Sequence, residues 1–561
     1  MNFDLLIFLF FYISSIISIL GYGLIFQKII NIPKNDFCLG YSGLIGIFFL
    51  TIISYTSNII LPHGLIHNSI IFIIGFFIFI YFFFKNYILK KDVKVFALIF
   101  LFLFLSFLVF KAHDDFPYYH FPYTYYLTEN SSYLGIGNFN HGFRTPSSLF
   151  YFNSLFYLPV INYNLFHIGS LVYFGFSIYL LVNKILTGLK NNQIDYLYYY
   201  NLLALIFIIV FFYRLAEHGT DRSALILVFI IISEILRIFN KVKISNYDVS
   251  IISVLYALII SLKAFYFLYI IMLIPLIFFI YYKLNIANIF KMFSKNKSVY
   301  FFIFLLFLVL FNNFLNTGCL IYPLEISCYT SFEWSIQKNE INRMILHYEN
   351  WSKAGMTPNF TVPNPEIYVK NFNWVSNWFE TYFLFKVSDF ILGIIILIFV
   401  AAIIFHSKQK KIYKWPKEIY LLYFIIIILI LEWFLNHPAL RYGGYSIIAI
   451  AVILPFSFYL NKNKLNLKNL RKKTIIILLI TISIFSYRNI DRLYKENKKY
   501  EYNVFKRPYY ELNNVHFRVD KELDSLITNY INCLENNKNC NFSENYKVKK
   551  SFGKYIFVRK K

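Results

Sequence analysis

Residues 95–122 read VFALIFLFLFLSFLVFKAHDDFPYYHFP, and this stretch decides the class of fold. The run from Val95 to Phe110 carries no charged side chain and is close to the length that crosses a bilayer as a helix. It ends on the adjacent pair Asp114 and Asp115, surrounded by His, Tyr and Pro. Because a carboxylate is costly in hydrocarbon, the pair marks either a polar loop at the membrane surface or a functional site.

The composition of the whole chain agrees with a membrane location. Of 561 residues, 58% are hydrophobic and only 15% are charged, and the mean hydropathy is +0.55. A soluble protein carries about 25% charged residues. The net charge of +25 does not indicate a nucleic-acid partner, because the lysines lie in short loops between apolar runs.

We therefore expect an all-α polytopic membrane protein with about fourteen spans. The predicted spans are 3–26, 39–60, 69–84, 95–111, 163–183, 199–213, 223–238, 249–262, 266–282, 299–316, 388–406, 419–435, 445–460 and 474–487.

The basic loops predict which ends of these spans share one side of the membrane. Lys and Arg concentrate in loops 85–94, 283–297, 408–417 and 461–473, which would then be cytoplasmic. This arrangement places the outer loops 111–162 and 317–387 and the tail on the opposite side. The chain then divides into a transmembrane domain, 1–487, and an external soluble tail of α/β type, 488–561.

Cysteine positions are compatible with that orientation. Cys319 and Cys328 share one predicted outer loop, and Cys533 and Cys540 share the tail. Disulfides persist in an oxidising exterior, so each pair is a candidate disulfide. Zinc is the alternative, although neither pair has the C-x-x-C spacing. Cys38 is left single, and we expect it to be a buried residue without a role.

The second half of the first outer loop predicts a further helix. Residues 145–159, TPSSLFYFNSLFYLP, are apolar, have a proline near each end and are too short to span the bilayer. We expect an amphipathic helix on the membrane surface or a re-entrant helix.

Three aspartates are candidate catalytic residues. A carboxylate at the end of a span can accept a proton from a substrate hydroxyl, and we favour Asp115 over Asp114 for this role. Asp221, in the sequence TDRS, is a third candidate, as a substrate or metal contact. The alternatives are an ordinary polar loop for the first pair and a helix N-cap for Asp221.

Polar residues in the same outer loop are candidate substrate ligands. The stretch GIGNFNHGFRTPSS, 135–148, contains Asn138, His141 and Arg144. Arg144 can bind a phosphate through two hydrogen bonds, and the Asn and His side chains, with His120, can bind sugar hydroxyls. Glycine-rich turns with an arginine reaching the membrane surface are the alternative.

Two cations outside this loop are further candidates for binding a lipid phosphate. Lys263 interrupts the apolar stretch 249–282, and Arg441 lies in NHPALRYGGY at the outer end of a late span. A lysine at the tip of a helical hairpin is the alternative for Lys263. A divalent cation on His113, Asp114, Asp115 and His120 is a possible cofactor, but we assign no metal ligands.

The order of these motifs resembles a known family. HDDFPYYHFP, GIGNFNHGFRTPSS, AEHGTD and GCLIYP, within about residues 95–450, resemble the GT-C superfamily of integral-membrane glycosyltransferases, and in particular one branch of uncharacterised bacterial multi-pass membrane proteins. The resemblance implies inverting transfer of a sugar from a polyprenyl-phosphate donor to an envelope glycan or lipid acceptor. It also implies an aspartate general base in the first outer loop, which corresponds to Asp114 or Asp115.

The resemblance further implies a bacterial inner membrane with the active site facing the periplasm. Two other functions remain open. A lipid-linked glycan polymerase or ligase would have a similar number of spans, but its main active loop is expected late in the chain. A transporter of lipid or solute would need charges or broken helices in two corresponding halves, and no internal repeat is visible.

Overall fold

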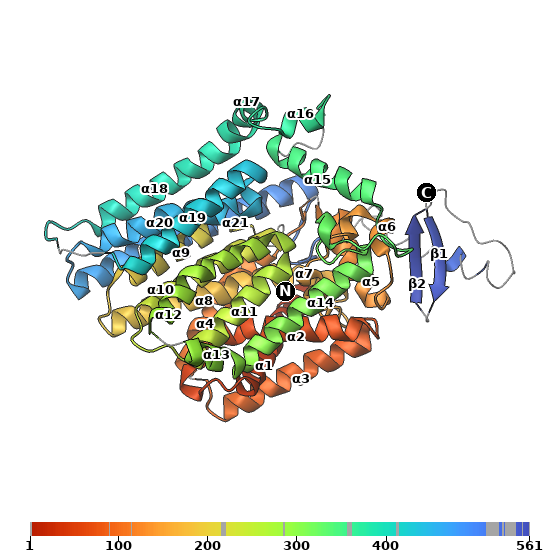
Figure 1. Ribbon diagram of the computed structural model, residues 1–561. Helices are drawn as coiled ribbons and strands as arrows, with labels where there is room; N and C mark the ends of the chain where they lie inside the picture. Colours follow the sequence, from red (N-terminus) through yellow and green to blue (C-terminus); the bar gives the residue numbers. More distant parts are fainter. Residues whose placement is uncertain are drawn as a thin grey trace.

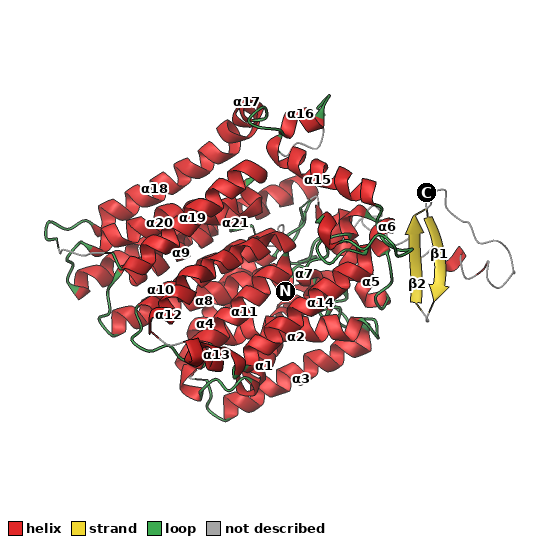
Figure 2. Cartoon of the chain, viewed as in Figure 1, coloured by secondary structure: helices red, strands yellow, loops and turns green. Residues whose placement is uncertain are grey.

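The computed structural model describes residues 3–88, 90–113, 115–214, 220–283, 286–355, 362–410, 415–511, 525, 527–529, 532, 546–551 and 554–559. Helices dominate this part of the chain, and one two-stranded hairpin projects from one end (Figures 1 and 2). Asp114, Cys533 and Cys540 lie outside the described residues, as does most of the tail after Glu511.

Long helices form the body of the molecule, as Figure 1 shows. Their bounds are α1 Phe3–Ile29, α2 Leu39–Asn58, α3 Leu65–Phe84, α4 Lys90–Phe107, α8 Ile168–Lys190, α9 Tyr196–Phe211, α10 Thr220–Phe239, α11 Asn246–Leu262, η5 Ala264–Leu273 continuing into α12 Ile274–Lys283, α14 Lys297–Thr317, α18 Ser388–Phe405, α19 Lys417–Asn436, α20 Tyr445–Asn461 and α21 Leu467–Tyr500.

Ten helices among the described residues are long and apolar enough to cross a membrane, so the chain is an all-α polytopic membrane protein. Every predicted span coincides with a helix, but four of these helices are not among the ten: α9 and α11 are shorter, and α4 and α10 carry more charged residues. Two helices extend furthest beyond their predicted limits. α18 continues a helix that begins at Val375, and α21 runs beyond 487 to Tyr500 because its polar residues also favour helix.

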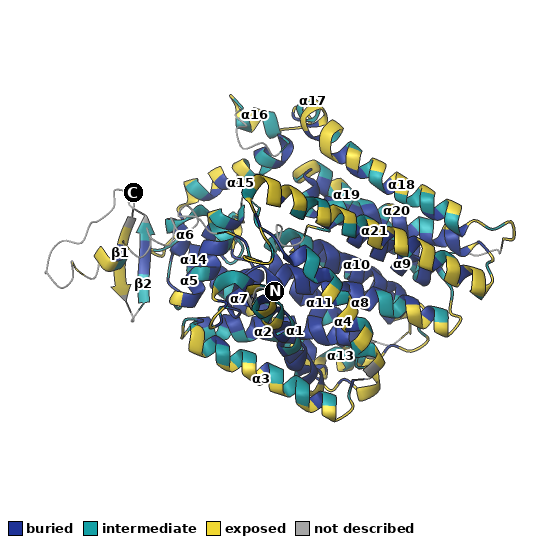
Figure 3. Cartoon of the chain, turned by 180° about the vertical axis from the view of Figure 1, so that it is seen from behind, coloured by how far each residue is buried: buried dark blue, intermediate teal, exposed yellow. Residues whose placement is uncertain are grey.

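Burial follows the pattern expected for helices surrounded by lipid. The central helices α2 and α8 are buried along most of their length, whereas α3 and α18 expose large apolar side chains (Figure 3). Phe77 and Phe399 are among these exposed residues. Exposed apolar surface of this extent is unusual on a soluble monomer and is typical of lipid contact.

Glycines allow the first three helices to approach closely. A Cβ atom at Gly21 would lie 1.8 Å from the carbonyl oxygen of Gly75 in α3, and one at Gly23 would lie 1.6 Å from that of Ser42 in α2. Small residues at helix interfaces are the usual means of close packing in membranes. The glycines of GYGLIF therefore serve helix packing.

Short helices gather at the end of the bundle that carries the hairpin (Figure 1). They are η2 Phe116–His120, α5 Phe121–Glu129, α6 Ile136–Phe139, η3 His141–Phe143, α7 Ser148–Ser154, η4 Tyr163–Leu165, η6 Glu325–Ser327, α15 Lys338–Lys353, α16 Pro365–Val369, α17 Val375–Trp378 and η7 Phe379–Val387. The hairpin consists of β1 Tyr546–Ser551 and β2 Lys554–Arg559, which pair antiparallel.

Two predictions for this end are resolved. Cys319 and Cys328 form a disulfide, as expected. The segment 145–159 is not an amphipathic surface helix, because every residue of α7 is buried. Its polar residues are internally bonded instead: Asn153 accepts from the backbone N–H of Gly169 at 2.9 Å. A short buried helix agrees better with the re-entrant alternative.

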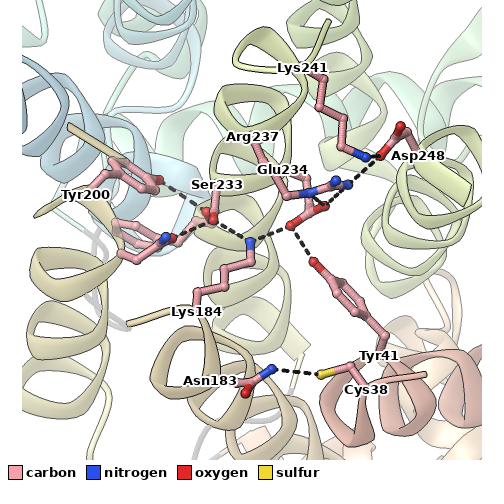
Figure 4. A network of polar contacts seen from close by, with 12 residues as sticks. Cys38, Tyr41, Asn183, Lys184, Tyr200, Ser233, Glu234, Arg237, Lys241 and Asp248 are labelled. Atoms are coloured by element: carbon pink, nitrogen blue, oxygen red, sulfur yellow. Dashed lines mark hydrogen bonds and ion pairs between the residues drawn. The ribbon is translucent and has the colours of Figure 1, made fainter. Parts of the chain in front are cut away.

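A network of charged residues joins five helices near the C-terminal end of α10 (Figure 4). Glu234 of α10 accepts hydrogen bonds from Tyr41 of α2 and Lys184 of α8, and from Arg237 at 2.8 Å. Arg237 also donates to Asp248 of α11 at 2.8 Å. Ser233 Oγ accepts from Lys184 and donates to Asn201 of α9. We call these residues, with Lys241, the Glu234 network.

The Glu234 network should stabilise the packing of these helices. Glu234→Gln leaves Lys184 and Arg237 beside a neutral amide, and unbalancing a buried ion pair costs about 3–5 kcal/mol. We expect denaturant unfolding in detergent, followed by circular dichroism, to show a free energy of unfolding lower by that amount. Glu333→Gln, which breaks the exposed pair with Lys549, is the control and should leave the midpoint close to wild type. Equal midpoints for the two variants would contradict this role.

Candidate functional site

Four charged residues, each predicted from the sequence as a site residue, meet at the end of the bundle near the short helices. They are Asp115, immediately before η2; Asp221, in the first turn of α10; Lys263, between α11 and η5; and Arg441, in the π-helix η8 Leu440–Gly444. We call them the ion-pair cluster. Because their segments are far apart in sequence, only the fold brings them together.

Asp221 is the centre of the ion-pair cluster. Lys263 Nζ lies 2.7 Å from Asp221 Oδ1, and Arg441 Nε lies 3.2 Å from Asp221 Oδ2. The second arm of Arg441 reaches Asp115, with Nη2 3.4 Å from Oδ2. Asp221 is 14% exposed, whereas Asp115 is 30% exposed. The more buried carboxylate thus pairs with both Lys263 and Arg441, whereas the more accessible one pairs with Arg441 at a longer distance.

This asymmetry separates the chemical abilities of the two carboxylates. Asp221 is engaged through both oxygens and orients the two cations. Asp115 uses one oxygen for Arg441 and the same oxygen lies 3.6 Å from His113 Nδ1. Of the two, Asp115 is therefore better placed to accept a proton from a bound hydroxyl.

The local backbone explains how each cation reaches the cluster. Lys263 has extended backbone angles between two helical segments, so α11 ends there and its side chain turns toward α10. Arg441 lies beside a kink in which Tyr442 and Gly443 leave helical geometry, and Gly443 has φ +99°. Only glycine adopts that angle readily. A Cβ atom at Gly443 would also lie 1.9 Å from the Tyr269 hydroxyl.

Aromatic rings surround the two cations. Lys263 Nζ lies 4.7 Å from the centroid of the Tyr442 ring, and the guanidinium carbon of Arg441 lies 5.4 Å from the same centroid. The hydroxyl of Tyr266 lies 3.5 Å from the backbone oxygens of Asp221 and Arg441. Cation–π contacts and this tyrosine thus fix the cations without neutralising them.

His120 lies beside the ion-pair cluster. Its Nε2 atom is buried and has no hydrogen-bond partner among the described residues. Burial lowers the pKa of His120 to about 4, although the charge of Asp115 opposes this shift. A neutral imidazole with an unsatisfied buried nitrogen is suited to bind a hydroxyl group of a ligand.

The pKa of His120 predicts how stability depends on pH. Between about pH 6.5 and pH 4 the unfolded chain binds a proton at this histidine and the folded chain does not, so acidification lowers the free energy of unfolding. We expect His120→Asn to lose less thermal stability than wild type between pH 7 and pH 4.5. The exposed His406→Asn is the control and should follow wild type. Identical losses in all three proteins would contradict the prediction.

The other predicted ligands form contacts that hold the outer loops together. Arg144 is buried and donates to Glu340 of α15 at 2.9 Å, to the Tyr322 hydroxyl at 3.2 Å and to the Gly137 oxygen at 3.0 Å. Hydrogen bonds from Arg144 and Arg343 lower the pKa of Glu340, outweighing the opposing effect of burial. The guanidinium of Arg144 is thus engaged by protein groups.

Asn138 and His141 also bond within the protein. Asn138 Nδ2 donates to the backbone oxygen of Trp334 at 2.7 Å and to that of Phe557 in β2 at 3.2 Å. His141 Nε2 lies 3.3 Å from the Tyr348 hydroxyl of α15, and burial lowers the pKa of His141 to about 4. These residues tie loop 111–162 to loop 317–387 and to the hairpin.

Residues of α21 that the sequence did not single out hold the chain just before Asp115. Glu496 is buried and accepts from the backbone N–H of Phe110 at 3.1 Å. Arg492 forms an ion pair with Glu496 at 3.2 Å and donates to the Leu108 oxygen at 2.7 Å. Phe116, which directly follows Asp115, packs against Tyr510. The i, i+4 spacing of Arg492 and Glu496 is typical of an ion pair on one face of a helix and was the sequence signal that could have identified this pair.

Glu496→Ala should therefore loosen the segment that carries Asp115. The change removes the acceptor of the Phe110 N–H and of Arg492 Nη1, at a cost of about 1–3 kcal/mol. We expect hydrogen exchange to become roughly ten-fold to hundred-fold faster at 108–113, with α11 unchanged. Asp491→Asn, at an exposed pair in the same helix, should leave this exchange at the wild-type rate. Unchanged protection in Glu496→Ala would refute the positioning role.

The divalent cation on His113, Asp114, Asp115 and His120 stays a prediction. Among them, no group of three or more His, Cys, Asp or Glu side chains is placed to hold a metal ion. Asp115 and Asp221 each contact Arg441, so positive charge is already supplied by a side chain. Asp114 of the predicted set lies outside the described residues.

Fold and site together define an all-α polytopic membrane protein in which charged residues from four segments meet at one end of the bundle. A family described as "Domain of unknown function (DUF8201)" matches residues 5–448. The chain belongs to this family. The matched region contains the whole ion-pair cluster and ends before α21. No curated protein and no solved structure matches the chain.

Proposed function

We propose that the protein is a membrane glycosyltransferase that moves a sugar from a polyprenyl-phosphate donor to a hydroxyl of an envelope glycan or lipid. The observation that carries this proposal is the ion-pair cluster, in which the accessible carboxylate of Asp115 contacts Arg441, one of the two cations held by Asp221. The resemblance of HDDFPYYHFP and the neighbouring motifs to GT-C glycosyltransferases supports the same reaction. The site would face the periplasm of a bacterial inner membrane.

In this reaction Asp115 accepts the proton of the acceptor hydroxyl while the hydroxyl oxygen attacks the anomeric carbon of the sugar. The bond between that carbon and the phosphate oxygen breaks, and the configuration inverts. Lys263 and Arg441 stabilise the negative charge that develops on the leaving phosphate. Asp221 keeps both cations in place, and the neutral His120 binds a hydroxyl of the sugar or acceptor.

The two carboxylates give the proposal a specific test. Asp115→Asn retains the size of the side chain but cannot accept the proton, and we expect transfer to fall about 10²–10⁴-fold with donor binding intact. Asp221→Asn removes the carboxylate charge that holds Lys263 and Arg441 in place, and it should weaken donor binding as well. Purified variants would be compared with radiolabelled polyprenyl-phosphate sugars and an envelope extract.

Asp491→Asn removes an exposed carboxylate outside the cluster and serves as the control, with wild-type transfer expected. Equal transfer by wild type and Asp115→Asn would exclude Asp115 as the base. If wild type transfers sugar from no donor but moves a labelled lipid or solute across vesicles, the protein is a transporter and the proposal fails.

A further inference from the structure

The Glu234 network carries more positive than negative charge, and its cations are more exposed than its carboxylates. Among the described residues, Lys184, Arg237 and Lys241 form ion pairs with two carboxylates, Glu234 and Asp248. The carboxylates are 0% and 1% exposed, whereas the three cations are 16%, 22% and 32% exposed. The network therefore presents cationic groups toward its surroundings and buries the anionic ones.

Neighbouring residues add to this excess. Lys283, at the end of α12, donates to the backbone oxygen of Lys241 at 2.7 Å, which brings a fourth cation to the end of α10. Lys243 is exposed in the adjacent turn. Asp195 is a further carboxylate at this end of α10 and accepts from Asn240 at 3.1 Å. Among the residues named here, five cations accompany three carboxylates, so the charge of this set remains positive.

Exposed aromatic residues place these cations at the level of lipid headgroups. Tyr282, directly before Lys283, is 82% exposed at the end of the apolar helix α12. Phe290, on the short amphipathic helix α13 Ile286–Ser294, is 75% exposed. Tyrosine at the ends of spanning helices and amphipathic helices along the surface both mark the membrane–water interface.

We propose that Arg237, Lys241 and Lys283 form a binding site for the phosphate group of an anionic phospholipid. Arginine and lysine N–H groups donate to phosphate oxygens, and the acyl chains would lie along the exposed apolar face of α12. This site is independent of the proposed transfer reaction. It lies at the other end of α10 from Asp221. The helical rise between Asp221 and Glu234 corresponds to about 20 Å.

The test measures binding of a fluorescent phosphatidylglycerol to the full-length protein in detergent, at low salt and at increasing salt. The variant is Lys241→Gln/Lys283→Gln. The control is Lys462→Gln/Lys468→Gln, which removes two exposed lysines from another basic loop. Thermal unfolding without added lipid confirms that all three proteins are folded.

We expect wild type and the control to bind alike, and the variant to bind about five-fold more weakly for each lysine removed. Binding should weaken as salt rises. Equal affinities for the variant and the control would overturn the site. Competition by inorganic phosphate at the same concentration as the lipid would overturn the assignment to a phospholipid, and preference for phosphatidylcholine would overturn the anionic requirement.

Discussion

The ion pairs of Asp221 with Lys263 and Arg441 are the interaction on which the proposed site depends. A carboxylate this poorly exposed at the end of an apolar helix is stable only with cations beside it. Meeting that requirement brings the junction of α11 and η5 and the kink at η8 against the start of α10. Arg441 then has its second arm available for Asp115. The ion pairs that stabilise the charge of Asp221 therefore also bring Lys263, Arg441 and Asp115 together.

Helices α10 and α11 carry charged residues at both of their ends. α10 begins with Asp221 and ends near Arg237, and α11 begins near Asp248 and leads into Lys263. Between these ends both helices are apolar and buried, which leaves the membrane interior without charge. The cluster at one end leaves a carboxylate accessible, and the network at the other leaves cations accessible. This difference underlies the separate roles proposed for the two ends.

The sequence predicted much of this arrangement because hydrophobicity and loop charge are local properties. Long apolar runs identified the helices, and the alternation of basic loops placed Asp115 and Arg441 on one side, where the structure brings them into contact with each other and, through Asp221, with Lys263. Residues with internal partners were harder to recognise. The ion pair of Arg144 with Glu340 could not be predicted because the two residues are distant in sequence, and the contact of Glu496 with Phe110 and the burial of α7 depend on tertiary packing.

A double-mutant cycle between Asp221 and Lys263 tests the central claim most directly. Asp221→Asn, Lys263→Met and the double variant would be unfolded by denaturant in detergent, and the coupling free energy obtained from the four proteins. Residues in one ion-pair network couple by about 0.5–3 kcal/mol, so the account predicts that the double variant is less destabilised than the sum of the single variants by an amount in that range. Additive effects would show that the two charges do not interact, and would contradict the ion-pair cluster on which the proposed function rests.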